Sequence, residues 1–288
     1  MKAAPFEYAD PRTVDEAVAL LASHGDEAKV LAGGQSLVPM LALRLARPAI
    51  VIDVNRVAGL DATQQNGATL DVGALVRQRA LERWAAGGAP LLAAALGHIG
   101  HAPIRARGTV AGSIAHADPA SELPALLLCL DGAVEARSRR GARTIAAADF
   151  FQGPLMTALA ADELVTQIRF TLPPAHAGWG FREMARRQGD FALVGVAAVL
   201  VVARGAITDA RVALFGAAAT PVRARETERA LAGRAPTDAV IAEAAAHAVT
   251  GVETVSDLHA PASYRASVAR TLTARALADA AGRAKALA

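Results

Sequence analysis

The sequence predicts an α+β protein of two domains, the second built from an antiparallel sheet and helices. Three observations support this prediction. Helical and strand patterns alternate through the first 172 residues, a Pro173-Pro174 pair then interrupts the chain, and three apolar strand patterns followed only by helices come after it. We therefore expect an N-terminal domain over residues 1–175 and a C-terminal domain over 176–288.

The first 56 residues are expected to form a small α/β lobe. Thr13 and Glu16 form a capping box, which marks the start of a helix. A short strand then ends at Gly33-Gly34, and Ser36 has the side chain of an N-cap for the next helix. The expected elements are a helix from residue 14, a strand over 28–31, a helix over 37–45 and a buried strand over 49–54.

Residues 57–175 are expected to form a larger lobe. Asp118-Pro119 predicts a helix start, because an N-cap side chain precedes a proline at the first helical position. The glycine-rich stretch 97–119 has little helical or strand periodicity and is expected to be a loop. The other expected elements are strands over 70–73 and 163–172, helices over 77–86, 91–96 and 118–130, and a hairpin over 133–138 and 144–148.

The C-terminal domain is expected to begin with three strands and to continue in helices. The strands cover 181–186, 191–203 and 206–219, the last two joined by an Arg204-Gly205 turn. The helices cover 222–232, 237–249 and 263 to the end of the chain. Strands followed by helices are typical of an α+β domain.

Composition and charge exclude several classes of function. The formal net charge of +3 is too small and too evenly spread for a nucleic-acid-binding protein. A single cysteine, Cys129, excludes a disulfide framework and an iron–sulfur cluster held by this chain alone. The longest apolar stretch, 191–203, suits a buried strand and is too short for a membrane span. Since the N-terminus also has no signal-peptide pattern, we expect a cytoplasmic protein.

The segment Ala32-Gly33-Gly34-Gln35-Ser36 is the first candidate binding site. Two glycines allow a positive φ and let a ligand approach the backbone closely, and the turn opens onto a predicted helix. Unpaired N–H groups in such a turn bind phosphate without a lysine. The same pattern also occurs in a tight strand-to-helix connection that binds nothing.

The segment Gly108-Thr109-Val110-Ala111-Gly112-Ser113 is the second candidate. It does not match the dinucleotide pattern G-x-G-x-x-G, so a Rossmann fold is not expected here. Two glycine loops in different lobes suggest a long ligand whose pyrophosphate lies between the lobes. Two purely structural turns are the alternative.

Two further kinds of chemistry have less support from the sequence. His98, His101, His116 and Asp118 could be imagined as metal ligands, but their spacing is not helical and no cysteine accompanies them. The serines of the two loops stand outside a G-x-S-x-G motif, so covalent serine catalysis is not expected.

Two groups of arginines are candidate contact sites. Arg186-Arg187, followed by Gln188-Gly189-Asp190-Phe191, forms a charged turn with an aromatic residue, which suits a ligand or subunit contact. The second group surrounds a predicted hairpin turn and suits either a solvated turn or docking to an acidic partner subunit. Its members are Arg137, Arg139, Arg140 and Arg143.

Together these motifs resemble one known family. The segments LAGGQSLVPMLALRL from residue 31 and RARGTVAGSIAHADPASELPALLLCLDG from residue 105 look like the FAD-binding medium subunit of the molybdenum hydroxylases. That family includes carbon monoxide dehydrogenase and the flavin domain of xanthine dehydrogenase. The similarity covers the whole chain, because FREMARRQGDFALVGVAAVL and YRASVARTLTARAL resemble the C-terminal domain of the family.

The resemblance implies a two-lobed FAD-binding domain of the vanillyl-alcohol-oxidase type, with FAD between the lobes. The two glycine loops would hold the pyrophosphate through backbone amides, and Glu122 would lie near the adenosine end. Leu164 would pack on the flavin and Phe191 would lie near the isoalloxazine ring. Whether Arg182 or Glu183 contacts the flavin stays open. The implied cofactor contacts are Leu31, Ala32, Gly33, Gly34, Gln35, Ser36, Leu37, Val38, Ile99, Thr109, Val110, Ala111, Gly112, Ser113, His116, Glu122, Leu164 and Phe191.

The resemblance further implies an electron-transfer function within a heterotrimer. A large molybdopterin subunit would oxidise the substrate, two [2Fe-2S] clusters on a small subunit would carry the electrons, and FAD on this chain would pass them to an external acceptor. Whether the heterotrimer dimerises stays open. The alternative enzyme is a stand-alone FAD-dependent oxidoreductase of the same fold, and the non-enzymatic alternative is an assembly subunit without cofactor.

Overall fold

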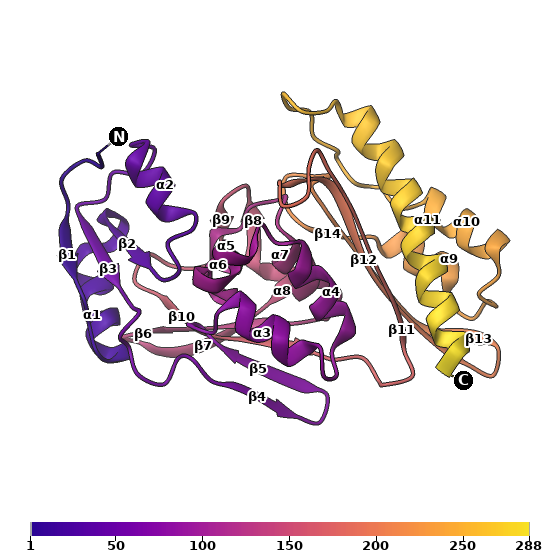
Figure 1. Cartoon of the computed structure of the whole chain (residues 1–288), viewed down its shortest axis with the longest axis horizontal. Helices are drawn as coiled ribbons and strands as arrows, with labels where there is room; N and C mark the ends of the chain where they lie inside the picture. Colours follow the sequence, from indigo (N-terminus) through magenta and orange to yellow (C-terminus); the bar gives the residue numbers. More distant parts are fainter. Residues whose placement is uncertain (1, 288) are drawn as a thin grey trace.

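The computed structural model describes residues 2–287, and side chains as far as residue 284. Figure 1 shows three parts in a row: a small N-terminal lobe, a larger central lobe, and a C-terminal part that ends in the long helix α11 (Ala262–Leu287). Helices and strands are mixed in all three, so the α+β prediction is confirmed. No helix in the described range is long and apolar enough to cross a membrane.

The small lobe contains a three-stranded parallel sheet in the order β1-β3-β2. The capping box predicted at Thr13 is confirmed, since Glu16 N donates to Oγ1 of Thr13 and the Glu16 carboxylate accepts from the Thr13 amide. Ser36 occupies the N-cap position of α2, but its hydroxyl caps no amide, so that prediction was wrong. The elements are β1 (Glu7–Ala9), α1 (Val14–His24), η1 (Gly25–Glu27), β2 (Ala28–Leu31), α2 (Leu37–Ala42) and β3 (Ile50–Asp53).

The larger lobe contains a five-stranded antiparallel sheet in the order β4-β5-β10-β6-β7. Its helices lie beside this sheet and extend toward the C-terminal part (Figure 1). The strands are β4 (Thr63–Asn66), β5 (Thr69–Gly73), β6 (Ala133–Ser138), β7 (Gly141–Ala146) and β10 (Leu164–Thr171), with a separate hairpin of β8 (Phe151–Gly153) and β9 (Met156–Thr157). The helices are α3 (Gln78–Ala85), α4 (Pro90–His98), α5 (Ala102–Arg107), α6 (Val110–His116), α7 (Glu122–Cys129) and α8 (Ala147–Phe150).

Two predictions for the larger lobe were wrong. The glycine-rich stretch is not a loop, because α5 and α6 form within it. They have six and seven residues, too short for an apolar period to be visible, and Thr109 caps the second of them. The helix predicted from Asp118 begins at Glu122 instead. Asp118 uses its carboxylate to accept the Ala120 amide at 2.9 Å, which forms a turn before the helix.

The C-terminal part is a four-stranded antiparallel sheet in the order β11-β12-β13-β14 with helices packed on it. The meander of β12 and β13 is confirmed, but β13 ends at Phe215, where Gly216 turns the chain at φ +70°. Residues 222–223 form an edge strand in place of the predicted helix start. The elements are β11 (Gly178–Ala185), β12 (Ala192–Ala203), β13 (Ala206–Phe215), β14 (Val222–Arg223), α9 (Arg225–Leu231), α10 (Asp238–Ala246) and α11.

The C-terminal sheet is covered on both faces. Helix α11 packs on β11 and β12, while α4 and α7 of the larger lobe pack against β11, β12 and β13. The hydrophobic core of the larger lobe therefore continues into the C-terminal sheet. We call the contact of α4 and α7 with this sheet the domain interface.

An aromatic column runs through the domain interface. The Phe215 ring fills the space above Gly195, where a Cβ would lie 1.9 Å from the ring. Phe215 stacks on Phe181 with ring centroids 5.8 Å apart, and Phe181 contacts the His98 ring at 5.0 Å. Side chains of both domains are thus packed in one continuous column across the interface.

Candidate functional site

The first glycine loop connects β2 to α2 and presents amides that have no protein partner. Gly34 has φ +74°, a conformation that favours glycine. The carbonyl oxygen of Ala32 accepts from Asn55 Nδ2 at 2.8 Å, and that of Gly33 accepts from Gln35 Nε2 at 3.1 Å. Within the described residues, no protein acceptor takes the N–H groups of Gly33, Gly34 or Gln35. The loop therefore offers donors to an anion while two of its carbonyls are occupied.

The second glycine loop lies at the start of α6. The Thr109 hydroxyl accepts the Gly112 amide at 3.1 Å, and the Thr109 backbone forms an isolated antiparallel bridge with Arg77. Thr109, Val110 and Ala111 are buried, whereas Gly112 is exposed and Ser113 is half-buried. The residues of this loop that a ligand can reach are therefore Gly112, through its backbone, and Ser113.

The two loops touch each other although they belong to different lobes. A Cβ on Gly33 would lie 2.6 Å from the carbonyl oxygen of Arg107 and 2.7 Å from Cα of Gly108. Both neighbours are backbone atoms, which cannot turn aside as a flexible side chain can. Only glycine at residue 33 allows the loops to approach this closely.

The other residues predicted to contact the cofactor occupy different environments. Glu122 and Leu164 are buried, and Leu164 belongs to the core of the larger lobe at the start of β10. Phe191 is 64% exposed, which is unusual for a phenylalanine. Half-buried or exposed positions are occupied by Leu31, Ser36, Leu37, Val38, Ile99, His116 and Phe191.

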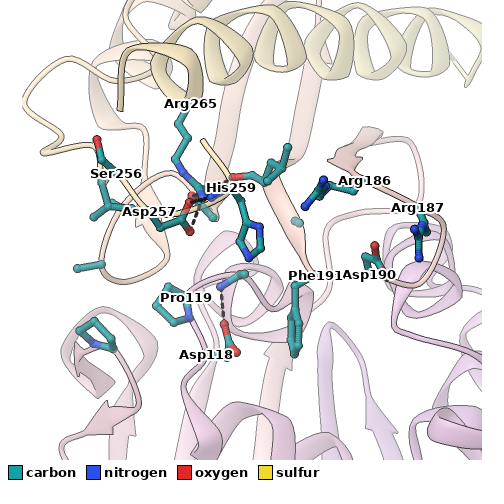
Figure 2. Close-up of a pocket in the computed structure, with 18 of the residues that line it drawn as sticks. Asp118, Pro119, Arg186, Arg187, Asp190, Phe191, Ser256, Asp257, His259 and Arg265 are labelled. Atoms are coloured by element: carbon teal, nitrogen blue, oxygen red, sulfur yellow. Dashed lines mark hydrogen bonds and ion pairs between the residues drawn. The ribbon is translucent and has the colours of Figure 1, made fainter. Parts of the chain in front are cut away.

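A pocket of about 870 Å³ lies between the two domains. Figure 2 shows Asp118 and Pro119 of the larger lobe on one side and His259 pointing toward them from the other. The turn predicted to lie beside a ligand lines the same pocket through Arg186 and Phe191. Its volume is large enough for an aromatic ring system together with a small molecule.

A buried arginine supports the wall of this pocket. Arg265 of α11 is 3% exposed, donates to the Gly216 carbonyl at 2.6 Å and also donates to the Leu193 carbonyl. Its Nη2 group donates to Asp257 at 2.7 Å, as the dashed line in Figure 2 marks. This bond and two amide bonds outweigh the cost of desolvation and lower the Asp257 pKa to about 2. Asp257 is therefore negatively charged beside the pocket at neutral pH.

Two buried carboxyl groups lie at the domain interface. Burial raises the pKa of Glu122 to about 8, and repulsion from Glu183 adds to the rise. Burial also raises the pKa of Glu183 to about 7. Oε2 of Glu183 is buried without a hydrogen-bond partner and lies 3.7 Å from Nδ1 of His98, whose own pKa burial lowers. The environment of both glutamates thus favours the protonated form.

Sequence reasoning did not identify every residue of these sites. Asp257 and His259 line the pocket from a segment without periodic pattern, and Arg265 lines it from the predicted C-terminal helix, where no local signal marks it. Asn55, which holds the first glycine loop, follows directly after the buried strand β3. A polar residue in that position is a signal that could have identified it. In the described part of the chain, no cluster of three or more His, Cys, Asp or Glu could hold a metal.

Two family comparisons cover almost the whole chain. Residues 4–173 match the family described as the FAD-binding domain in molybdopterin dehydrogenase. Residues 179–280 match the CO dehydrogenase flavoprotein C-terminal domain.

Several relatives are similar over their full length. The nicotine 6-hydroxylase medium subunit of Paenarthrobacter nicotinovorans is 41% identical, with 98% of this chain and 100% of the relative covered. The carbon monoxide dehydrogenase medium chain of Afipia carboxidovorans is 35% identical, with 97% and 98% covered. Among solved structures, carbon monoxide dehydrogenase from Hydrogenophaga pseudoflava matches with a TM-score of 0.95 and 38% identity, covering 98% of this chain and 99% of that one. Quinoline 2-oxidoreductase from Pseudomonas putida 86 matches with a TM-score of 0.93 and 36% identity, covering 99% of both chains.

The residues of the two loops fit the cofactor that these comparisons indicate. Free amides and occupied carbonyls in the first loop, and the glycine that lets the two loops touch, are features that suit a pyrophosphate. The resemblance seen in the sequence is confirmed. The chain is an FAD-binding oxidoreductase subunit and belongs to the family of medium subunits of carbon monoxide dehydrogenase and related molybdenum hydroxylases.

Proposed function

We propose that this chain transfers electrons within a heterotrimeric molybdenum hydroxylase. It receives electrons from [2Fe-2S] clusters of a small partner subunit, after a large molybdopterin subunit has oxidised the substrate, and delivers them to an external acceptor. The observation that carries the proposal is the contact of the two glycine loops from different lobes, with free amides on the first. The similarity to medium subunits of several such enzymes supports it.

We assign the pyrophosphate of FAD to the gap between the two loops. The N–H groups of Gly33, Gly34 and Gln35 and the hydroxyl of Ser113 are the donors available there. Ser36 offers a second hydroxyl, which is available because it does not cap α2. Bound FAD supplies two-electron chemistry at its isoalloxazine ring, and the protein binds, orients and partly shields it.

We assign the isoalloxazine end of the site to the pocket between the domains. Phe191 offers an exposed aromatic face there, and Ile99, directly after α4, and His116, at the end of α6, belong to the same lobe as the second loop. Arg186 and Arg187 line the same pocket together with Asp118, Asp190 and Asp257, so its wall carries charges of both signs. The two arginines are the groups there that could pair with an anionic group of an acceptor. Glu122 and Leu164 lie within the same lobe and complete the proposed contact set.

We also propose that the boundary between the two domains lies between residues 175 and 176. Pro173-Pro174 lies between the last strand of the larger lobe and the first strand of the C-terminal sheet. The small lobe would end near residue 56, directly after Asn55. The partner subunits would hold the iron–sulfur clusters, because the lone Cys129 is buried and cannot ligate one.

Spectroscopy and reconstitution test the proposal. The purified chain should bind one FAD and show the absorption bands of oxidised flavin, yet oxidise no N-heterocycle, aldehyde or carbon monoxide by itself. Addition of the cluster and molybdenum subunits should then allow substrate to bleach the flavin. Turnover by the isolated chain, with no molybdenum found by metal analysis, would instead identify a stand-alone FAD-dependent oxidoreductase. Absence of flavin binding would identify an assembly subunit without cofactor.

A further inference from the structure

We infer that Asn55 and Arg77 are positioning residues that fix the distance between the two glycine loops. This inference rests on the proposed location of the FAD pyrophosphate between those loops. Asn55 follows β3 in the small lobe, and Arg77 precedes α3 in the larger lobe. Arg77 Nη2 donates to Asn55 Oδ1 at 2.7 Å, so one hydrogen bond joins the two lobes.

Each partner of this bond also holds one of the loops. Asn55 Nδ2 donates to the carbonyl oxygen of Ala32 at 2.8 Å, and Arg77 Nη1 donates to the carbonyl oxygen of Arg107 at 2.6 Å. The result is an unbroken chain of hydrogen bonds from one glycine loop to the other. Both ends are backbone carbonyls next to the residues that approach the pyrophosphate.

Backbone hydrogen bonds on both sides of Arg77 hold the start of this series of side-chain hydrogen bonds in place. The amide of Val110 donates to the Val76 carbonyl at 3.0 Å, and the amide of Gln78 donates to the Gly108 carbonyl at 2.9 Å. The segment before α3 is therefore paired with the second loop on both sides of Arg77. On the other side of the gap, Asp53 Oδ1 accepts from Asn55 Nδ2 and from the Asn55 amide, which orients the Asn55 side chain.

The chemistry of the two side chains explains why these residue types suit the task. An asparagine amide can donate to the Ala32 carbonyl and accept from Arg77 at the same time. A guanidinium has two separate Nη groups, which here reach two acceptors in different lobes. Neither acceptor of Arg77 is charged, and the Asp53 carboxylate attracts the guanidinium only through space, without a hydrogen bond to it among the described residues. The geometry of Arg77 is thus set by the two loops and not by a carboxylate.

The effect of substituting Arg77 on FAD affinity distinguishes a role of its charge from a role in joining the loops. If Arg77 acted only through its charge, Arg77→Lys would preserve FAD affinity, because lysine keeps the charge. If Arg77 acts by joining the loops, Arg77→Lys should weaken FAD binding, because an ammonium group cannot reproduce the two-pronged geometry. Asn55→Ser keeps a small hydroxyl at residue 55 but cannot span from Arg77 to Ala32, so it should cause a partial loss.

The experiment measures FAD affinity and the state of the bound pyrophosphate in the full chain. Apoprotein is titrated with FAD while flavin fluorescence is recorded, and phosphorus NMR is recorded on the saturated protein. Asn55→Ala and Arg77→Lys should each raise the Kd about tenfold and shift the phosphorus resonances. The double variant should bind FAD as tightly as whichever single variant binds FAD less tightly, because the two residues act as one unit. Asn66→Ala and Arg139→Lys, both at exposed positions, are the matched controls and should bind as wild type.

The melting temperature of each apoprotein separates positioning from folding. Unchanged melting with weakened FAD binding supports the inference, and Asn55→Ser provides a milder variant if Asn55→Ala melts early. Wild-type affinity and unshifted phosphorus resonances in Arg77→Lys and Asn55→Ser would overturn it. If the wild-type chain itself binds no FAD, the proposed function fails, and that outcome is distinct from a failure confined to the variants.

Discussion

Replacing Glu183 by glutamine should change how the stability of this protein depends on pH. The Glu183 side chain lies at the domain interface, is 4% exposed and faces His98, and its Oε2 has no hydrogen-bond partner. Glutamine has nearly the same shape as a protonated glutamate but cannot ionise. The variant therefore removes the cost of burying a charge and leaves the packing of β11 intact.

The sign and size of the effect follow from the pKa of Glu183, which burial raises from 4.5 to about 7. The native state then binds more protons than the unfolded state between these values, so stability present below pH 4.5 is lost as pH rises through 7. This difference in pKa corresponds to about 3 kcal/mol, of which about 1 kcal/mol is already lost at pH 5.5. Glu183→Gln should therefore gain about 2 kcal/mol on the wild type between pH 5.5 and pH 9.

The other ionisable groups of this cluster do not reverse the expectation. Burial lowers the pKa of His98, which acts with the opposite sign, but His98 is present in both proteins and largely cancels in their difference. The pKa of Glu122 is raised to about 8 partly by Glu183, so its charge becomes easier to bury in the variant. This second effect adds to the gain at pH 9.

Urea unfolding at pH 5.5 and pH 9 measures the difference. Trp84 of α3 and Trp179 of β11 lie in different domains, so their summed fluorescence reports on the unfolding of both. Glu253→Gln, at an exposed position, is the control and should follow the wild type at both pH values. If Glu183→Gln differs from the wild type by the same free energy at pH 5.5 and pH 9, the assignment of a buried, proton-holding carboxyl is refuted.

Three further predictions concern the cofactor site and the core. Gly33→Ala should abolish FAD binding, because its Cβ would lie 2.6 Å from the Arg107 carbonyl, about 0.8 Å closer than ordinary contact; retained flavin stoichiometry in the purified variant would contradict this. Phe191→Ala should speed reoxidation of the reduced protein by oxygen, measured by stopped-flow absorbance, whereas an unchanged rate would place Phe191 away from the flavin. Burial raises the Cys129 pKa to about 12, so a thiol reagent should label Cys129 only after unfolding, and labelling of the native protein would show that its environment is open.

Local signals in the sequence predicted the elements that local interactions determine. The capping box of Thr13 and Glu16 formed because both hydrogen bonds lie within one turn. Helices α5 and α6 were missed because short helices are held by caps and by packing, which leave no apolar period. Asp118 could have capped a helix, and the structure uses the same carboxylate for a turn. A single side chain can serve either purpose, and tertiary packing decides between them.

Only part of the candidate site could be predicted from the sequence. The glycines at residues 33 and 34 were identified because their lack of a side chain is itself a signal. Asn55 and Arg77 were not identified, because their role depends on a hydrogen bond between two lobes, which exists only in the folded protein. The raised pKa of Glu183 also depends on the folded protein, since only the domain interface removes this carboxyl group from water and places it beside Glu122.

The aromatic column has a consequence for how the two domains can move relative to each other. Phe215 is seated in the space above Gly195, stacks on Phe181 and reaches His98 in the other domain. Hinge bending between the domains would have to pull this column apart and expose its rings to water. We therefore expect the two domains to move as one body, so that access to the pocket between them changes through the exposed turn from Arg186 to Phe191.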